Sequence, residues 1–155
     1  APQDAAYAYS ILIQPTAGEL AAAQKEPGYS ILRRDRQAHI VFDRASGVTG
    51  YAAFEAVSLP EDEVVADIAS ETMVMRRTAE DGTLIVSVCD PDLHIKEKTY
   101  TTPEPSAPSF KTLHLRGVWS LAVPNEKVKV QSAGDVTEIT VTCRHGQPVE
   151  FRLKK

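Results

Sequence analysis

Few residues of this sequence could carry chemistry, and the histidines are the first to consider. They are scattered, with no pair at i and i+4 and no Cys-x-x-Cys motif, so the spacing of a zinc site is absent. Alternation with neighbouring leucines places one histidine on the polar face of a strand, and another precedes a glycine in a predicted hairpin turn. We expect surface or turn positions rather than catalytic ones for all four: His39, His94, His114 and His145.

An Asp-Pro-Asp motif at residues 90–92 could bind calcium through its two carboxylates. It lacks a third oxygen ligand and the downstream glutamate of an EF-hand, so a turn after a strand explains it better. The sequence also has no Gly-x-Ser-x-Gly elbow, phosphate-binding loop or dinucleotide fingerprint. We therefore expect no catalytic residue, no cofactor and no metal in this chain, and a small β enzyme is the least supported hypothesis.

Two cysteines and one tryptophan remain. Cys89 and Cys143 each end an apolar, β-like run, where buried free thiols are common. A disulfide between them requires their Cα atoms to lie within about 7 Å, which leaves that alternative open. Trp119 could stack on a sugar ring, but a tryptophan on a strand of a small sandwich is more often part of the core.

Short apolar runs separated by turns dominate the sequence and predict an all-β fold, an antiparallel β-sandwich with one short N-terminal helix. The strongest hairpin signal is Asp81-Gly82. The helix is predicted from Thr16 to about Lys25, because Thr16 and Glu19 have capping-box spacing. The strands are expected at residues 6–13, 29–33, 38–42, 48–54, 71–76, 83–88, 95–100, 110–115, 118–123, 128–131, 137–143 and 148–153.

Composition limits the class of protein. The chain has 155 residues, of which 43% are hydrophobic and 25% charged, which suits one domain with a real core and excludes disorder or a collagen-like repeat. No apolar run approaches the roughly 20 residues of a membrane-spanning helix. The first residues lack the pattern of a signal peptide, and the chain starts without methionine, so we expect a processed chain or a fragment.

The net charge is −4, and the basic residues of the second half are spread singly along predicted strands, which argues against a nucleic-acid partner. The densest basic spot is Arg33, Arg34 and Arg36, which could contact an acidic polysaccharide but is more simply a solvated strand end. Three prolines at 103–109 predict an extended crossing between two sheets rather than a linker between lobes.

Several segments together are more specific than a general β pattern. A Tyr-x-Tyr strand at 7–13 precedes a proline and a helix, and the segments at 29–33, 38–41, 47–54 and 84–91 follow in order. In this order they resemble the C-terminal portion of the family 8 polysaccharide lyases, the group of chondroitin, hyaluronate and xanthan lyases. The tail, with Gly117-Val118-Trp119 and the segment at 145–149, is most similar to the chondroitin sulfate lyases.

The resemblance implies that residues 1–28 are the end of the large central β-domain and that residues 29–155 are the C-terminal antiparallel β-domain. Such lyases cleave uronic-acid glycans by β-elimination, using His, Tyr and Arg side chains of a helical toroid and the facing central domain. Such enzymes are much longer than this chain, and we expect neither region in it, so no catalytic residue can be carried over. Tyr7, Tyr9 and His39 are not substitutes.

The resulting hypothesis is an accessory C-terminal β-domain of a secreted or periplasmic bacterial glycosaminoglycan lyase, which braces a catalytic body. The expected partners are the upstream catalytic domains of the same polypeptide and an acidic polysaccharide, with no nucleic acid and no membrane. The expected docking face lies near the N-terminal strand: Tyr7, Tyr9, Ile11 and Ile13. The alternative is an independent carbohydrate-binding module, which requires an exposed aromatic row or the Arg33–Arg36 cluster on an open face.

Overall fold

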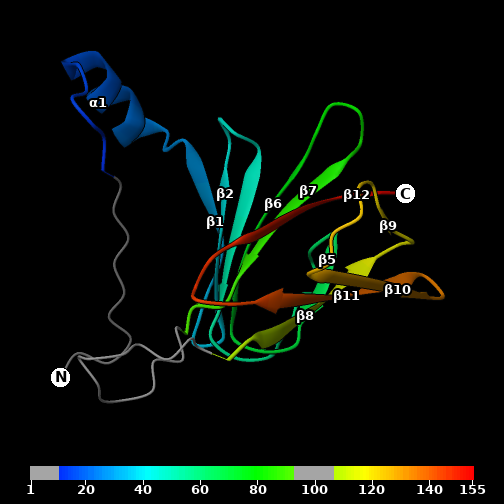
Figure 1. The fold of residues 1–155 in the computed structure, drawn as a ribbon. Coiled ribbons are helices and arrows are strands. Elements are labelled where there is room, and N and C mark those ends of the chain that lie inside the picture. Colours follow the sequence, from blue (N-terminus) through cyan, green and yellow to red (C-terminus); the bar gives the residue numbers. More distant parts are fainter. Residues whose placement is uncertain (1–10, 93–106) are drawn as a thin grey trace, which may run out of the picture.

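The computed structural model describes residues 11–92 and 107–155, which form two antiparallel sheets packed face to face (Figure 1). The described part of the first sheet has seven strands, in the spatial order β1 (Tyr29–Arg34), β2 (Ala38–Asp43), β3 (Val48–Ala53), β6 (Thr72–Thr78), β7 (Leu84–Cys89), β12 (Val149–Lys154) and β9 (Ser120–Leu121). The described part of the second has five, in the order β10 (Val128–Ala133), β11 (Val136–Cys143), β8 (Ser109–Arg116), β5 (Val65–Ile68) and β4 (Val57–Ser58). The predicted antiparallel β-sandwich is confirmed.

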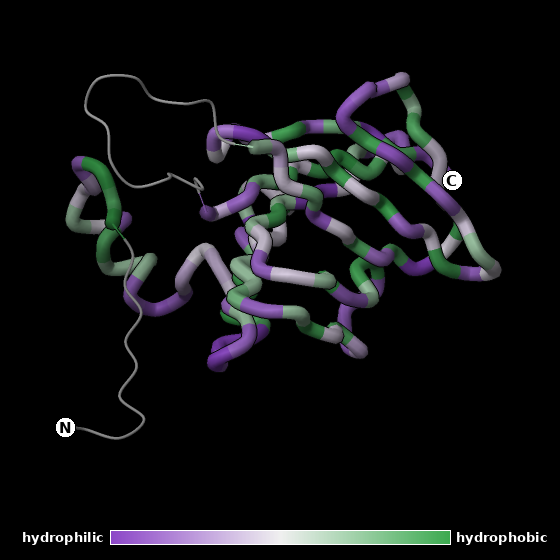
Figure 2. Tube along the Cα trace, turned by 60° about the horizontal axis from the view of Figure 1, so that its bottom comes forward, coloured by the Kyte–Doolittle hydropathy of each residue, from purple (hydrophilic) through white to green (hydrophobic). Residues whose placement is uncertain are grey.

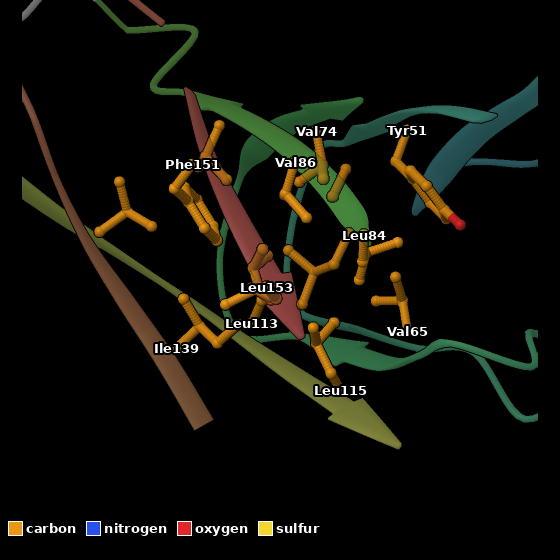
Figure 3. Close-up of a cluster of buried hydrophobic side chains, with 14 of the residues drawn as sticks. Tyr51, Val65, Val74, Leu84, Val86, Leu113, Leu115, Ile139, Phe151 and Leu153 are labelled. Carbon is orange, nitrogen blue, oxygen red and sulfur yellow. The ribbon is translucent and has the colours of Figure 1, made fainter. Parts of the chain in front are cut away.

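Alternation of apolar and polar residues builds both layers, because successive side chains of a strand point to opposite faces. Buried and more exposed residues alternate strictly along β7 and β12, and Figure 2 shows hydrophobic and hydrophilic residues alternating along the strands. The core between the sheets is therefore formed by one face of each. Figure 3 shows its centre, where side chains of the two layers meet: Val74, Leu84, Val86, Phe151 and Leu153 from the first sheet and Leu113, Leu115 and Ile139 from the second.

Turn residues fix the hairpins. Gly82 has φ +80°, in the left-handed region that glycine adopts without strain, and its N–H donates to the carbonyl of Ala79. His145 and Gly146 also have positive φ, so they form the predicted turn between β11 and β12. The hairpin prediction at Asp81-Gly82 is confirmed, because β6 and β7 pair. The turn at His145-Gly146 is also present, but it connects strands of different sheets and is not the turn of a hairpin between β11 and β12.

Helix α1 (Ala17–Lys25) is the helix of the described residues. The Thr16 hydroxyl accepts from the Glu19 N–H, and the Glu19 carboxylate accepts from the Thr16 N–H, which is the predicted capping box. No residue of α1 is buried, and Figures 1 and 2 both show it standing away from the sheets. The sequence therefore determines where the helix begins, while the sandwich does not cover it.

Most predicted strands are confirmed, with four differences. The expected strand at 118–123 is only Ser120–Leu121, and the sequence reading missed β4 and β5. In the expected strand at 6–13, residues 11–13 are not in a strand, and the others, with the expected strand at 95–100, lie outside the described residues.

The chain changes sheet between β7 and β8. Most of residues 103–109 lie outside the described part, so the proline-rich crossing stays a prediction. The assignment of residues 1–28 and 29–155 to two lyase domains stays a prediction.

Candidate functional site

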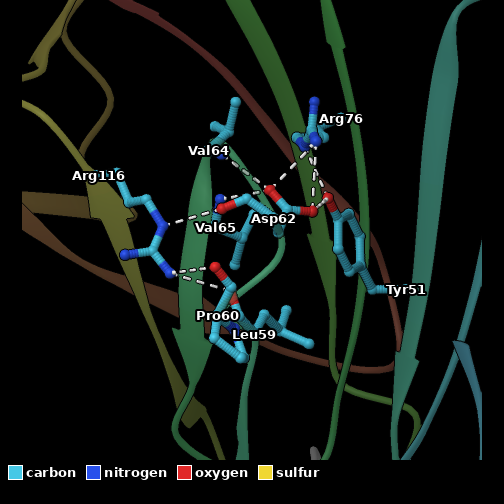
Figure 4. Close-up of polar contacts among 8 residues, drawn as sticks. All are labelled: Tyr51, Leu59, Pro60, Asp62, Val64, Val65, Arg76 and Arg116. Carbon is cyan, nitrogen blue, oxygen red and sulfur yellow. Dashed lines mark hydrogen bonds and ion pairs between the residues drawn. The ribbon is translucent and has the colours of Figure 1, made fainter. Parts of the chain in front are cut away.

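One polar cluster joins the two sheets (Figure 4). Tyr51 on β3 and Arg76 on β6 belong to the first sheet, whereas Asp62 lies in the connection between β4 and β5 of the second. The Tyr51 hydroxyl donates to Asp62 Oδ2 over 2.5 Å, and Nε of Arg76 donates to the Tyr51 hydroxyl over 2.6 Å. Nη2 of Arg76 lies 3.2 Å from Asp62 Oδ1. The three side chains, called the Asp62 clamp below, form a closed set of hydrogen bonds.

The connection that carries Asp62 is held from two sides. Its Oδ1 atom accepts from the backbone N–H groups of Val64 and Val65, each over 2.8 Å. Arg116, at the end of β8, donates from Nε to the Asp62 carbonyl over 2.8 Å and from Nη2 to the Leu59 carbonyl over 3.0 Å. The Arg116 guanidinium therefore has a structural role, because it fills backbone acceptors of this connection.

These contacts decide what the clamp can do chemically. Burial raises the pKa of Tyr51 well above its ordinary value, so its hydroxyl stays protonated. Burial also acts to raise the pKa of Asp62, but hydrogen bonds from Tyr51 and two backbone amides, with the charge of Arg76, outweigh it and lower the pKa. Tyrosine and arginine are residue types that β-elimination uses, yet Tyr51 is 3% exposed and its hydroxyl donates a hydrogen bond to a carboxylate. We interpret the cluster as structural.

A buried lysine is the centre of a second cluster. Lys111 on β8 and Asp90 after β7 have side chains that are 3% and 2% exposed. Lys111 Nζ lies 2.8 Å from Glu71 Oε1 and 3.2 Å from Asp90 Oδ1, and the Ser109 hydroxyl donates to the other Asp90 oxygen. Burial acts to lower the pKa of Lys111, but the two carboxylates outweigh it and raise the pKa. The amine therefore stays charged and cannot serve as a nucleophile or base at neutral pH.

The Asp-Pro-Asp motif forms a turn, as predicted. The N–H of Asp92 donates to Asp90 Oδ1 over 3.0 Å, which closes the chain on itself after β7. The sequence analysis missed the buried ion pair with Lys111, although Lys111 shares the inward parity of Leu113 and Leu115. Among the residues that the structure describes, no group of three or more His, Cys, Asp or Glu side chains could hold a metal ion.

Of the predicted histidine positions, His114 has the richest surroundings. It lies on the outer face of the second sheet, opposite Asp67 of β5 and Glu138 of β11. Its Nδ1 lies 2.6 Å from Asp67 Oδ1, and its Nε2 lies 3.3 Å from Glu138 Oε2. The hydrogen bond to Asp67, with the charges of both carboxylates, raises the pKa of His114. The expected polar-face position is confirmed, and a His held between two carboxylates favours the charged imidazolium.

The remaining candidates are also placed. His39 is exposed on β2 and contacts the exposed ring of Phe54 edge to face, with 5.1 Å between the ring centroids. His145 is exposed in its turn, whereas His94 lies outside the described residues. Trp119 is 7% exposed, so the core prediction is confirmed and a glycan platform at this residue is excluded.

Arg33 is engaged by its own hairpin and by β4, and is not open to a polyanion. It donates to the Asp35 carboxylate, the Gln37 side chain and the Ser58 carbonyl. Cys89 and Cys143 are free thiols, and the Cys89 sulfur donates to the Gly146 carbonyl over 3.0 Å. Burial raises the pKa of both thiols, which keeps them unreactive.

One pocket of about 570 Å³ lies beside Trp119 and is lined by side chains of both charges. Lys155 places its ammonium 5.2 Å from the centroid of the Trp119 ring, and Arg116 is already bound to backbone carbonyls. Glu63 and Asp81 line the same pocket, so acidic and basic groups face one another. This mixture suits no single class of charged ligand.

None of the described helices has the length and apolar character needed to cross a membrane.

Comparison with known proteins identifies relatives of this chain. The chondroitin sulfate ABC endolyase of Proteus vulgaris is 36% identical over 157 residues, which cover 98% of this chain. This chain is homologous to part of the chondroitin sulfate ABC lyases. A chondroitin sulfate ABC exolyase of Bacteroides thetaiotaomicron is 27% identical over 176 residues and covers the whole chain. No protein-family model matches the chain. The resemblance stated from the sequence is confirmed.

Solved structures show the same fold. A chondroitin AC lyase of Streptomyces coelicolor A3 covers 90% of this chain with a TM-score of 0.65 and 15% identity. A xanthan lyase of Paenibacillus covers 92% with a TM-score of 0.67 and 15% identity. The chain spans 15% and 17% of the length of the two curated relatives, so it corresponds to a small part of each.

Proposed function

We propose that this chain is an accessory β-sandwich of a glycosaminoglycan lyase, and that it stabilises the catalytic body without taking part in the β-elimination. The observation that carries this proposal is a difference in coverage. The match to the endolyase covers 98% of this chain but 15% of that protein, so the whole chain matches a region that is short for such an enzyme. A secreted or periplasmic location and an acidic polysaccharide substrate belong to this proposal.

The site chemistry supports the same function. In the described residues, the polar groups of both clusters have partners within the protein: the Asp62 clamp through its own members and two backbone amides, and Lys111 through two carboxylates. Neither cluster contains a histidine. Removal of the C5 proton of a uronate needs a base open to substrate and a group that neutralises the carboxylate. Tyr51 fails the first requirement because its hydroxyl is buried and protonated.

The activity of the chain tests this proposal. The chain is incubated with chondroitin sulfate and with hyaluronan, and the unsaturated product is followed by ultraviolet absorbance. We expect no product, while a full-length chondroitin sulfate ABC lyase serves as the positive control. The lyase that contains this chain is then prepared with and without residues 11–155, and we expect a lower melting temperature without them. Unsaturated product from the chain alone, or unchanged stability of the truncated lyase, would contradict the proposal.

A second function, an independent carbohydrate-binding module, is supported by one observation. Phe54 is 53% exposed and contacts His39 edge to face, and His39 is the cross-strand partner of Arg34 in the β1–β2 ladder. An exposed ring beside a cation could stack on a sugar and pair with its carboxylate or sulfate. Calorimetric titration with chondroitin sulfate tests this function, and a Phe54→Ala variant with at least about tenfold weaker binding would support it.

A further inference from the structure

The outer faces of the two sheets differ in chemistry. On the second sheet, the middle of the outer face is polar: Thr112, His114, Lys129, Glu138 and Thr140. This is the pattern of an antiparallel sheet with one face in water. On the first sheet, the middle of the face of β1, β2, β3 and β6 that points away from the core is apolar or small, with His39, Asp43 and Arg77 around it. We call it the apolar outer face: Ile31, Val41, Gly50, Ala52, Met73 and Met75.

The strand register makes this face continuous. Ile31, Val41, Gly50 and Met75 are consecutive cross-strand partners, so they form one row across four strands. His39, Ala52 and Met73 form the neighbouring row. Because side chains alternate between the two faces of a strand, the buried residues of β2, β3 and β6 fix which residues point outward.

The side chains of the apolar outer face are exposed. The exposed fractions are 42% for Ile31, 38% for Val41, 49% for Met73 and 56% for Met75. Gly50 and Ala52 have small side chains, so a partner could approach the backbone of β3 closely at these positions. Methionine adapts its shape to a contacting surface, and an apolar patch of this kind marks an interaction site.

We infer that the apolar outer face docks onto an apolar surface of the catalytic body of the same polypeptide. The inference rests on the proposed function and deepens it by naming the docking surface. Two observations select this occupant. The relatives that match this chain are several times longer, so most of such a polypeptide lies outside the structure. The chain also enters the first sheet at the edge strand β1, which follows α1 and contributes Ile31 to this face.

The approach to β1 is itself apolar and uncovered. Ile11 and Ile13 are 79% and 89% exposed, and Leu20 on α1 is 44% exposed. Apolar residues on the entering segment and on the adjoining sheet face would be covered together by one body packed against that edge. The centre of the face carries no charge, which favours a protein surface over an acidic glycan as its occupant.

The two methionines are the natural probes of this surface. Hydroxyl-radical footprinting with mass spectrometry is applied to this chain alone and to the full-length lyase that contains it. We expect oxidation of Met73 and Met75 to slow at least about tenfold in the lyase, because docking removes them from water. Phe110 is the internal control, since it is 64% exposed on the outer face of the other sheet and should react equally in both samples.

Each outcome decides a separate point. Protection of Met73 and Met75 with an unprotected Phe110 supports the inference. Protection of Phe110 alone overturns the inference but keeps the proposed function, because the domain then docks through its second sheet. Unchanged reactivity of all three residues overturns the inference and also the bracing function. Concentration-dependent protection in the isolated chain would instead identify a second copy as the occupant and overturn the inference.

Matched variants of the full-length lyase add a second readout. Met75→Glu places a charge on the apolar outer face, whereas Thr140→Glu places the same charge on the polar face, next to Lys129. We expect the first variant to lower the melting temperature of the lyase and to restore Met73 oxidation, and the second to change neither. Equal effects of both variants would contradict docking through this face.

Discussion

Asp62 connects the two sheets, and its removal should destabilise the sandwich strongly. Its side chain is 9% exposed and that of Arg76 is 18% exposed, so the pair is much closer to a buried ion pair than to a surface one. Breaking a buried pair by removing one partner costs about 3–5 kcal/mol, whereas an exposed pair is worth below about 1 kcal/mol. For Asp62→Ala we expect a loss in the free energy of unfolding of about 2–4 kcal/mol. The contact of Arg76 with water reduces the cost, whereas the two backbone amides that lose their acceptor add to it.

Urea denaturation measures this loss. Trp119 is the single tryptophan of the chain and is buried, so its fluorescence reports unfolding of the sandwich. Linear extrapolation gives the free energy of unfolding, and the expected decrease in melting temperature is roughly 5–15 °C for a chain of this size. Asp135→Ala, in the exposed turn between β10 and β11, is the matched control and should change stability by less than about 0.5 kcal/mol.

The pH dependence of the stability of Asp62→Asn separates the contribution of the Asp62 charge from that of the shape of its side chain. The folded-state pKa of Asp62 is lowered, so its charge stabilises the fold above the ordinary aspartate pKa and loses this effect as the pH falls through the folded value. The stability difference between wild type and Asp62→Asn should therefore be constant from neutral pH down to about pH 5 and should shrink below about pH 4. A loss below about 1 kcal/mol for Asp62→Ala, or a difference that is unchanged at low pH, would refute the reasoning.

Three further predictions concern other clusters. Lys111→Met should lower the free energy of unfolding in urea by about 2–4 kcal/mol, because Asp90 loses its buried cation, and adding Asp90→Asn should recover part of the loss. The raised pKa of His114 stabilises the fold fully below the ordinary histidine pKa and ceases to do so as the pH rises through the folded value. His114→Gln should thus cost more at pH 5.5 than at pH 9, by below about 1 kcal/mol because the pair is partly exposed, and an NMR titration with an unshifted midpoint would contradict this. Thr16→Ala should reduce the helical circular dichroism, since such caps are worth about 0.5–2 kcal/mol, but should leave the melting of the sandwich unchanged because no residue of α1 is buried. A shift of several degrees would show that the helix packs on the body of the protein.

Local signals explain why most of the fold could be predicted. The capping box of Thr16 and Glu19 needs only neighbours three residues apart, and the Asp81-Gly82 hairpin needs only a glycine at positive φ. The inward position of Trp119 followed from its residue type and surroundings. The capping box and the hairpin depend on contacts within a few residues, so a single sequence contains the information.

The short strands β4 and β5 could not be predicted in the same way. Val65–Ile68 follows the acidic run Glu61-Asp62-Glu63 and contains Asp67, so its pattern is weaker than that of β7 or β11. It becomes a strand because β8 supplies its hydrogen-bond partners, nearly 50 residues away in the chain. Strand pairing at that distance is decided by tertiary packing rather than by local propensity.

By itself, the sequence determined the sheet-forming class, the helix start, the turns and the relation to the lyases, because periodicity, caps and ordered motifs are local or linear properties. Only the tertiary structure decided the partners of the charged side chains. Lys111 meets Glu71 across 40 residues, and Asp62 meets Tyr51 and Arg76 from a connection that had no recognisable pattern. A buried charge pairs with the opposite charge that lies beside it in the folded chain, and the packing of the two sheets determines which one that is.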